Sequence, residues 1–357
     1  MTHAVTLNLF QTLNDTTVPC CTANARYSRR FTGHFFRHGT ARPTLKIMTI
    51  SEFKSQTVKL LAKTSPSPQL DVEVLLEHFT GLTKTLQLLN NHSQIENDKI
   101  DDLNDAVKKR MSGLPVAYIT GNKEFFGYDF FVTPDVLIPK PDTEILVEYA
   151  VDMILAKIDA QKNRILTICD MCAGSGCIGL SVIKTLNEEY DIPPQKIPQV
   201  TFVDISRNAL EIAEKNAQAL LNKELQARIK FIRSNLFEFV PYHFDFILTN
   251  PPYIPHTMVD QLLQDGRNEP RLALDGDVSI DGDRAQNPDG EFLDDGLSLP
   301  KNLIEQSLDH LAPRGKIIME CGEYNCEKAA CFARLNGYKT ELYRDLEGQF
   351  RGFIGHL

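Results

Sequence analysis

The tetrapeptide Asn250-Pro251-Pro252-Tyr253 has the residue types of a site that binds a planar amino group. Two consecutive prolines fix φ and remove two amide donors, so this turn presents rigid backbone carbonyls as acceptors. Together with the Asn250 side-chain oxygen, they could accept both hydrogens of an NH2 group while Tyr253 covers its flat face. Conjugated nitrogens are poor nucleophiles, so holding both hydrogens would turn the lone pair towards an electrophilic methyl group. A turn without function is the alternative, but such a tetrapeptide arises by chance in about one chain in a thousand.

A glycine-rich segment, DMCAGSGCIG at residues 170–179, follows an apolar stretch and opens a helical one. Glycines let the backbone approach a ligand closely, and the helix amides offer donors there. Asp204 ends the next apolar stretch, where its carboxylate could accept both hydroxyls of a ribose. Capping the helix at Ser206 is the structural alternative for this acid. A nicotinamide cofactor and S-adenosylmethionine both fit these two features, but a dehydrogenase would leave the tetrapeptide unused.

These residues must be held by the elements that alternate after residue 141. Apolar patterns predict strands at 165–169, 200–203, 229–233, 244–248 and 316–320, helices at 142–160, from the glycine turn to about 190, and at 206–222, 300–312 and 325–336, and two terminal strands. This alternation predicts a parallel, doubly wound α/β sheet with helices on both faces. Ligands of such sheets bind beyond the carboxyl ends of the strands. The glycine segment, Asp204 and Asn250 all fall at such ends.

The residues before this sheet follow a different hydrophobic pattern. Apolar residues recur at helical spacing in two stretches: Leu70, Val74, Leu75 and Phe79, and Ile100, Leu103, Val107 and Met111. This periodicity predicts a small helical domain over 48–115. Aromatic and β-branched residues around Gly121 and Gly127 then predict a β-hairpin linker within 116–141. The remaining residues, 142–357, form the expected catalytic domain.

Charge sets residues 1–47 apart. Of the net charge of −9, they contribute +5, which leaves −14 for residues 48–357. An arginine-rich segment with a single acid suits organelle targeting. Alternatively, Met48 begins an amphipathic segment and could be the true initiator, which would make the extension dispensable. We therefore expect a cytoplasmic protein, or a mitochondrial one if residues 1–47 are a targeting segment. No apolar run approaches the length of a transmembrane helix, so we expect no membrane association.

Two further patterns suggest metals and are rejected. Cys169 and Cys172, with Cys177 nearby, have zinc-like spacing, but one lies in a strand and the other in a loop, and a second pair is missing. We predict small buried hydrophobic residues there, and no metal site. The irregular, Asp-rich segment 254–299 lacks the glycine and glutamate of a calcium loop. We expect a lid or an insertion, with solvated disorder over 275–296.

The chain resembles the class I S-adenosylmethionine-dependent methyltransferases with a Rossmann-like sheet, and within them the peptide-chain release factor glutamine N5-methyltransferases, the HemK/PrmC family. The resemblance covers nearly all of residues 48–357. The motifs that carry it are GLPVAYITG at 113–121, EFFG at 124–127, VLIPKPDTE at 136–144, the glycine segment, NPPY at 250–253, Glu269-Pro270 with Ala273-Leu274, DGL at 295–297 and DLEG at 345–348. Their number and order make the resemblance far more specific than any one of them.

The resemblance implies a role for each matching residue. Cys172, Ala173, Gly174, Ser175, Gly176 and Asp204 would bind the methionine and ribose parts of S-adenosylmethionine, and Asn235 and Leu236 would lie by its adenine. Asn250, Pro251, Pro252 and Tyr253 would be the catalytic residues that hold the glutamine of the GGQ motif of a release factor, so that methylation modulates translation termination. Asn250 would also contact the cofactor. The helical domain would help to recognise that partner. Three residues depart from the family pattern: Cys172 replaces a frequent glycine, Lys140 a usual arginine, and Asn235 a common acid.

An amino-methyltransferase acting on adenine or cytosine of DNA or RNA is the alternative, because it would use the same acceptors. Such an enzyme needs a surface for phosphates, and a body with a charge of −14 offers no obvious one. We therefore expect no direct nucleic-acid binding. A scaffold protein without activity would keep the fold but not the tetrapeptide.

Overall fold

The computed structural model describes residues 48–161, 164–264, 268–279, 281–345 and 347–357. The predicted extension, residues 1–47, lies outside them. Within the described ranges, none of the helices is both long enough and apolar enough to cross a membrane.

The first described elements are four helices: α1 Ile50–Leu61, α2 Pro68–Thr80, α3 Lys84–Leu89 and α4 Asn97–Met111. Thr49 starts α1 with a reciprocal cap, in which its hydroxyl accepts from the Glu52 amide and the Glu52 carboxylate accepts from the Thr49 amide. Apolar residues of α1, α2 and α4, among them Phe53, Leu75 and Leu103, share one buried cluster. The predicted helical region is confirmed.

The buried face of α2 differs from the predicted one. Leu70 is 54% exposed, whereas Val72 and Leu76 are fully buried. With Leu75 and the partly buried Phe79, these residues follow the spacing i, i+3, i+4, i+7 of one helix face. Leu70, in the first turn after Pro68, lies off this face. Met111, at the last position of α4, is also exposed.

The segment after α4 begins with a short helix, not a strand. α5 spans Val116–Thr120, and the hairpin strands are β1 Asn122–Phe125 and β2 Tyr128–Phe131. The predicted hairpin therefore exists but starts later. Pro115 stands at the N-cap of α5 and Gly121 ends it with a φ of 71°, a conformation that favours glycine. The Tyr118 hydroxyl on α5 donates to the Val136 carbonyl at 2.6 Å.

Seven strands form the main sheet: β3 Thr167–Met171, β4 Gln199–Asp204, β5 Ile229–Arg233, β6 Phe244–Thr249, β7 Leu311–Glu320, β8 Lys339–Arg344 and β9 Phe350–His356. Their order is β5-β4-β3-β6-β7-β9-β8. Strands β3 to β7 are parallel, as predicted, but β9 is antiparallel to both of its neighbours. The sheet is therefore mixed, because β9 follows β8 in the chain but lies between β7 and β8 in the sheet.

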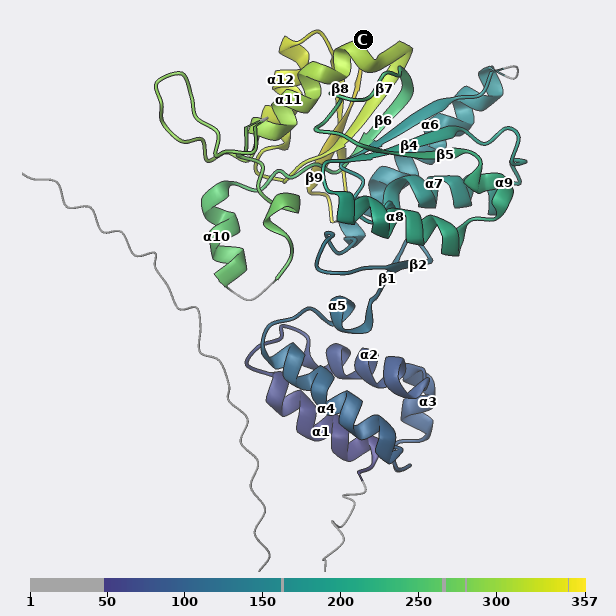
Figure 1. The fold of residues 1–357 in the computed structure, drawn as a ribbon, viewed down its shortest axis with the longest axis vertical. Coiled ribbons are helices and arrows are strands. Elements are labelled where there is room, and N and C mark those ends of the chain that lie inside the picture. Colours follow the sequence, from purple (N-terminus) through teal and green to yellow (C-terminus); the bar gives the residue numbers. More distant parts are fainter. Residues whose placement is uncertain (1–47, 162–163, 265–267, 280, 346) are drawn as a thin grey trace, which may run out of the picture. The chain divides into compact units, whose positions relative to one another are not determined.

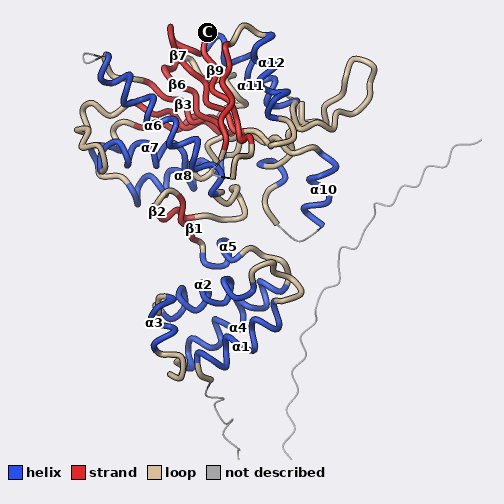
Figure 2. The backbone as a smooth tube through the Cα atoms, turned by 180° about the vertical axis from the view of Figure 1, so that it is seen from behind, coloured by secondary structure: helices blue, strands red, loops and turns tan. Residues whose placement is uncertain are grey.

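Helices cover both faces of the sheet, which lies between two groups of helices in both views (Figures 1 and 2). The helices of this region are α6 Glu144–Ala160, α7 Cys177–Glu188, α8 Arg207–Leu220, α9 Lys223–Gln226, α10 His256–Gln264, α11 Ser298–Ser307 and α12 Cys326–Leu335, with short 3₁₀ turns at Pro141–Thr143, Arg271–Ala273 and Leu308–His310.

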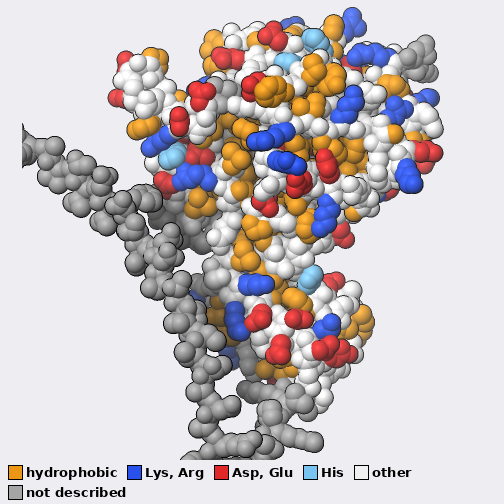
Figure 3. All heavy atoms as spheres, in the orientation of Figure 1, with side chains coloured by type: hydrophobic (Ala, Val, Ile, Leu, Met, Phe, Trp, Pro, Cys, Tyr) orange, Lys and Arg blue, Asp and Glu red, His pale blue; other side chains and the backbone are white. Residues whose placement is uncertain are grey.

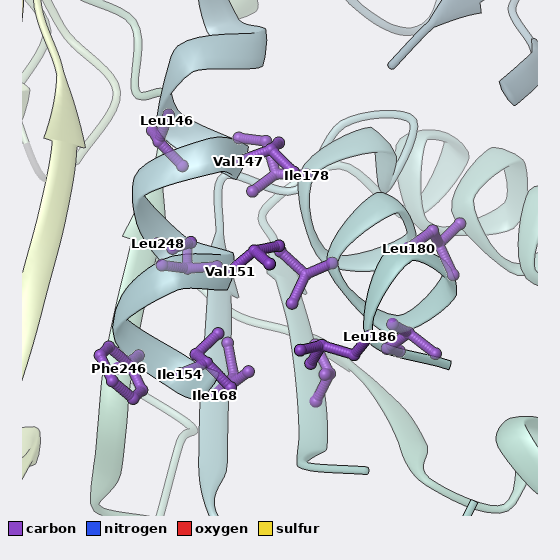
Figure 4. Packing of buried hydrophobic residues seen from close by; sticks show 14 of the residues in the cluster. Leu146, Val147, Val151, Ile154, Ile168, Ile178, Leu180, Leu186, Phe246 and Leu248 are labelled. Carbon is purple, nitrogen blue, oxygen red and sulfur yellow. The ribbon is translucent and has the colours of Figure 1, made fainter. Parts of the chain in front are cut away.

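Successive side chains of each strand enter opposite cores. Ile168 packs with α6 and α7, whereas its neighbour Cys169 packs with α11 and α12. Figure 4 shows the first of these cores, with Val147 and Val151 of α6 near Ile178 of α7.

The part of the segment 254–299 that the structure describes is more ordered than predicted. It contains α10, and isolated bridges pair Val278 with Arg284 and Gln286 with Phe292. Asp277 is fully buried, and its carboxylate accepts from the amides of His256 and Gly296. The expectation of solvated disorder is therefore wrong at this aspartate, because backbone amides replace the water that would otherwise solvate it.

We predict that Gly179→Ala destabilises the fold. The added methyl would lie 2.6 Å from the ring of Phe202, a fully buried side chain that stacks on Phe231. Overpacking costs about 1–3 kcal/mol, which outweighs the gain of up to about 1 kcal/mol in helix propensity. Denaturant unfolding should show a net loss of about 1–2 kcal/mol.

Ser181→Ala on the same helix is the matched control. Its hydroxyl is buried and has no hydrogen-bond partner among the described residues, so the change should stay within about 0.5 kcal/mol of wild type. A Gly179→Ala protein as stable as this control would contradict the packing described for Phe202.

Candidate active site

One cavity of about 170 Å³ lies at the carboxyl ends of four parallel strands. The sheet order reverses between β3 and β6, so the segments that follow these neighbouring strands diverge and leave a crevice. The predicted site residues that line the cavity are Cys172, Ala173, Gly174 and Ser175 after β3, Asp204 at the end of β4, Asn235 and Leu236 after β5, and Asn250 and Pro252 after β6. Gly176, Pro251 and Tyr253 are not among the lining residues.

The glycine loop turns through left-handed backbone conformations. Cys172, Gly174 and Gly176 have φ of 59°, 55° and 76°. A cysteine in this conformation carries strain of about 1–2 kcal/mol that glycine would avoid. Burial raises the pKa of the Cys172 thiol, so the thiol stays neutral.

Two contacts fix this loop from outside. The Asn216 side chain donates to the Ser175 carbonyl at 2.9 Å and exchanges hydrogen bonds with the backbone of Phe131 in the hairpin. Asp204 accepts from the Gly174 amide at 2.9 Å and from the Ser206 amide at 2.8 Å. The helix after it is capped by the Ser206 hydroxyl, which accepts from Ala209. Asp204 therefore ties the loop to β4, whereas the helix is capped by Ser206 and not by this acid.

The prediction that Cys169, Cys172 and Cys177 are small buried residues is confirmed at Cys169, which is fully buried in the core with α11 and α12. Cys172 and Cys177 are only partly buried. Among the described residues, no group of three or more His, Cys, Asp or Glu is arranged to hold a metal ion.

The turn after β6 is held at both of its polar ends. The Asn250 side-chain nitrogen Nδ2 donates to the Thr143 hydroxyl at 3.1 Å, and the Tyr253 hydroxyl donates to Glu320 Oε1 at 3.0 Å. The Tyr253 carbonyl accepts from the Asn325 side chain at 2.9 Å. Both prolines between the two ends are buried.

The segment 254–299 supports this turn. A Cβ on Gly296 would lie 2.0 Å from the Tyr253 carbonyl oxygen, so only glycine permits this approach. Gly296 is in turn held by Asp277 at 2.9 Å. Within its Asp/Gly-rich part, residues 275–296, Val278, Ser279 and Gly282 line the cavity. This Asp/Gly-rich part therefore contributes to the cavity wall.

Lys140, which stands where the family usually has arginine, pairs with a buried acid. Its ammonium lies 2.7 Å from Glu269 Oε1, and the same oxygen accepts from the Ile138 amide at 3.3 Å. Lys140 also lines the cavity. The ion pair joins the motif at 136–144 to the motif that begins at Glu269.

Sequence reasoning assigned no role to three buried polar residues at this edge: Thr143, Asp170 and Glu320. Burial raises the pKa of Asp170 to about 8 and that of Glu320 to about 7. Glu320 ends an apolar strand at the ligand edge, which is the same signal that identified Asp204. Thr143 lies within a quoted motif, but its contact with Asn250 joins residues far apart in the chain.

Comparisons with known proteins match two families along the chain. Residues 53–121 match the PrmC N-terminal domain, and residues 146–277 match the methyltransferase small domain.

Relatives match over most of their length. A release factor glutamine methyltransferase of Leptospira interrogans is 31% identical over 312 residues, covering 86% of this chain and 97% of the relative. One from Koribacter versatilis is 32% identical over 279 residues, covering 77% and 87%. A solved methyltransferase structure from Pyrococcus furiosus matches 73% of this chain and 98% of its own, with 15% identity and a TM-score of 0.40. The sequence matches at full length show that the chain is a methyltransferase and belongs to the release factor glutamine methyltransferase family.

Proposed function

We propose that this protein transfers a methyl group from S-adenosylmethionine to the side-chain amide nitrogen of the glutamine in the GGQ motif of a peptide-chain release factor. The observation that carries the proposal is the shared cavity, in which the glycine loop and Asp204 meet Asn250 and Pro252. A donor site and an acceptor site for an NH2 group thus open into one space. Family membership supports the same substrate.

S-adenosylmethionine fits the residues on the donor side. Cys172, Ala173, Gly174, Ser175 and Gly176, with Asp204, Asn235 and Leu236, would hold it. Asp204 keeps its acceptor oxygens at the cavity while backbone amides fix their direction, which suits the hydroxyls of a ribose. When bound, this cofactor supplies an electrophilic methyl group.

The turn at 250–253 would hold the acceptor. Its oxygens would take both hydrogens of the glutamine amide, so that the nitrogen lone pair faces away from them and towards the donor side. These hydrogen bonds strengthen as the nitrogen gains positive charge, and therefore favour the transition state over the bound substrate. Tyr253 has its hydroxyl on Glu320 and does not line the cavity, so its contribution would come through the shape of the turn.

The rest of the chain would serve recognition. We propose that a domain of residues 48–115 contributes to release-factor binding, that 116–141 links it to the catalytic domain of residues 142–357, and that the protein acts in the cytoplasm. Methylation of a nucleobase remains the alternative substrate class. On the face shown in Figure 3, basic and acidic side chains of the described residues are interspersed, which does not favour binding along a phosphate backbone.

Asn250→Ala should abolish methylation while cofactor binding persists, because it removes an acceptor for the substrate and leaves Asp204 intact. The measurement is mass spectrometry of a purified release factor after incubation with the protein and S-adenosylmethionine. Wild type should add one methyl group to the glutamine of the Gly-Gly-Gln loop. Asn336→Ala, at the end of α12 and outside the cavity lining, is the control and should behave as wild type. Retained transfer by Asn250→Ala would contradict its role.

Asp204→Asn should weaken cofactor binding. The amide would turn a donor towards the Gly174 or Ser206 amide, and it removes the charge that a ribose hydroxyl would meet. Hydrogen bonds to a charged group contribute about 1.5–3 kcal/mol, so calorimetry should show a Kd about 10- to 100-fold higher. Asp152→Asn, on the exposed side of α6, should leave the Kd unchanged. Equal affinity of both variants would exclude the ribose assignment.

A further inference from the structure

We propose that Thr143 and Glu320 are positioning residues that set the direction in which the Asn250 amide faces the cavity. The inference rests on the proposed function, because a glutamine NH2 group needs the Asn250 oxygen and not its nitrogen. Thr143 ends the 3₁₀ turn Pro141–Thr143 and Glu320 ends β7, so each approaches the 250–253 turn from another element. Both side chains are 2% exposed.

The amide of Asn250 can face the cavity in two ways. In the observed orientation, Nδ2 donates to the Thr143 hydroxyl at 3.1 Å. The oxygen Oδ1 therefore points away from Thr143. A hydroxyl can both donate and accept, and therefore Thr143 alone does not exclude the opposite orientation. The orientation is decided by where the hydrogen of the Thr143 hydroxyl points.

Glu320 supplies the acceptor for that hydrogen. Its Oε1 accepts from the Tyr253 hydroxyl at 3.0 Å, while its buried Oε2 has no hydrogen-bond partner among the described residues and is free to accept from the Thr143 hydroxyl, which lowers the pKa of this carboxyl. An ionised carboxylate can only accept, so it fixes the direction of both hydroxyls. The Thr143 oxygen is then left to accept from Asn250, which keeps the Asn250 oxygen available for the substrate amide. One carboxylate thus orders both polar ends of the turn.

This ordering depends on the charge of Glu320. A protonated carboxyl can donate to Thr143, which can then donate to the Asn250 oxygen and permit the wrong orientation. Burial raises the pKa of Glu320 to about 7, against the opposing effect of the two hydroxyls. Two charged groups around it influence the pKa of Glu320: Asp142 raises it and Arg351 lowers it. The charge of Glu320 in turn raises the pKa of four neighbouring groups, namely Tyr253, Tyr343, Cys177 and Cys321.

The value of kcat should increase with pH. Ionised Glu320 is the active form, so kcat should rise about tenfold between pH 6 and pH 8 with an apparent pKa near 7. Glu320→Gln cannot ionise. Its kcat should be lower by about tenfold or more and should lack this rise, because the hydrogen-bond direction is no longer imposed. Cofactor Kd should stay within about twofold of wild type, because Glu320 is not among the residues that line the cavity.

Thr143 offers a matched pair of variants. Thr143→Val keeps the shape but removes the hydroxyl, and should lower kcat about tenfold to a hundredfold. Thr143→Ser keeps the hydroxyl and should restore most of kcat. The assay is methyl transfer to a purified release factor by the full-length protein at pH 6, 7 and 8. Circular dichroism and cofactor titration establish that each variant is folded.

Two results would overturn the inference: a Thr143→Val protein with the kcat of Thr143→Ser, or a Glu320→Gln protein that keeps the tenfold rise with pH. If Glu320→Gln fails to fold, the Thr143 pair decides alone. Failure of the proposed function looks different, because wild type and Thr143→Ser would then leave the release factor unmethylated as well, and both claims would fall together.

Discussion

The site depends on one constraint, namely that the parallel strands β3, β4 and β6 end at the same edge of the sheet. Their order places β3 between β4 and β6, so whatever follows each strand must meet at that edge. The glycine loop, Asp204 and Asn250 come from separate parts of the chain and line one cavity for this reason. The helices and the two cores on either face serve to hold these three strand ends in register.

The same edge concentrates buried carboxyl groups. Asp170, Asp204 and Glu320 all have a raised pKa, because burial disfavours the charged form of each. Each is also hydrogen-bonded by backbone amides or hydroxyls, which partly offset that cost. Buried polar groups with fixed partners make rigid structure, since breaking any contact leaves an unsatisfied group. Such rigidity suits a reaction whose catalysis comes mainly from orientation.

Features that depend on local sequence could be predicted. The strand and helix alternation, the glycine turn and the acid at the end of β4 follow from apolar periodicity and from residue types, and the structure bears out the elements they predicted. The burial of Cys169 was predicted in the same way, because it lies in an apolar strand.

Features that depend on long-range contacts could not. Asp277 in the segment 254–299 looks like one more solvated acid until the amides of His256 and Gly296 are placed around it. The contact between Thr143 and Asn250 joins residues that only the fold brings together. The buried face of α2 was misjudged at Leu70, since periodicity gives the spacing of a stripe but tertiary packing selects which stripe is buried. β9 pairs antiparallel with β8 and β7, and the strand pattern alone did not predict this direction.

The central claim is that the cavity recognises the NH2 group of a glutamine side chain. The most direct measurement compares methyl transfer to a release factor and to its variant in which the Gly-Gly-Gln glutamine is replaced by glutamate. The two side chains have nearly the same shape, but the glutamate offers no hydrogens to the Asn250 oxygen. The account predicts one methyl group on the glutamine and none on the variant. Equal methylation of both proteins would contradict it.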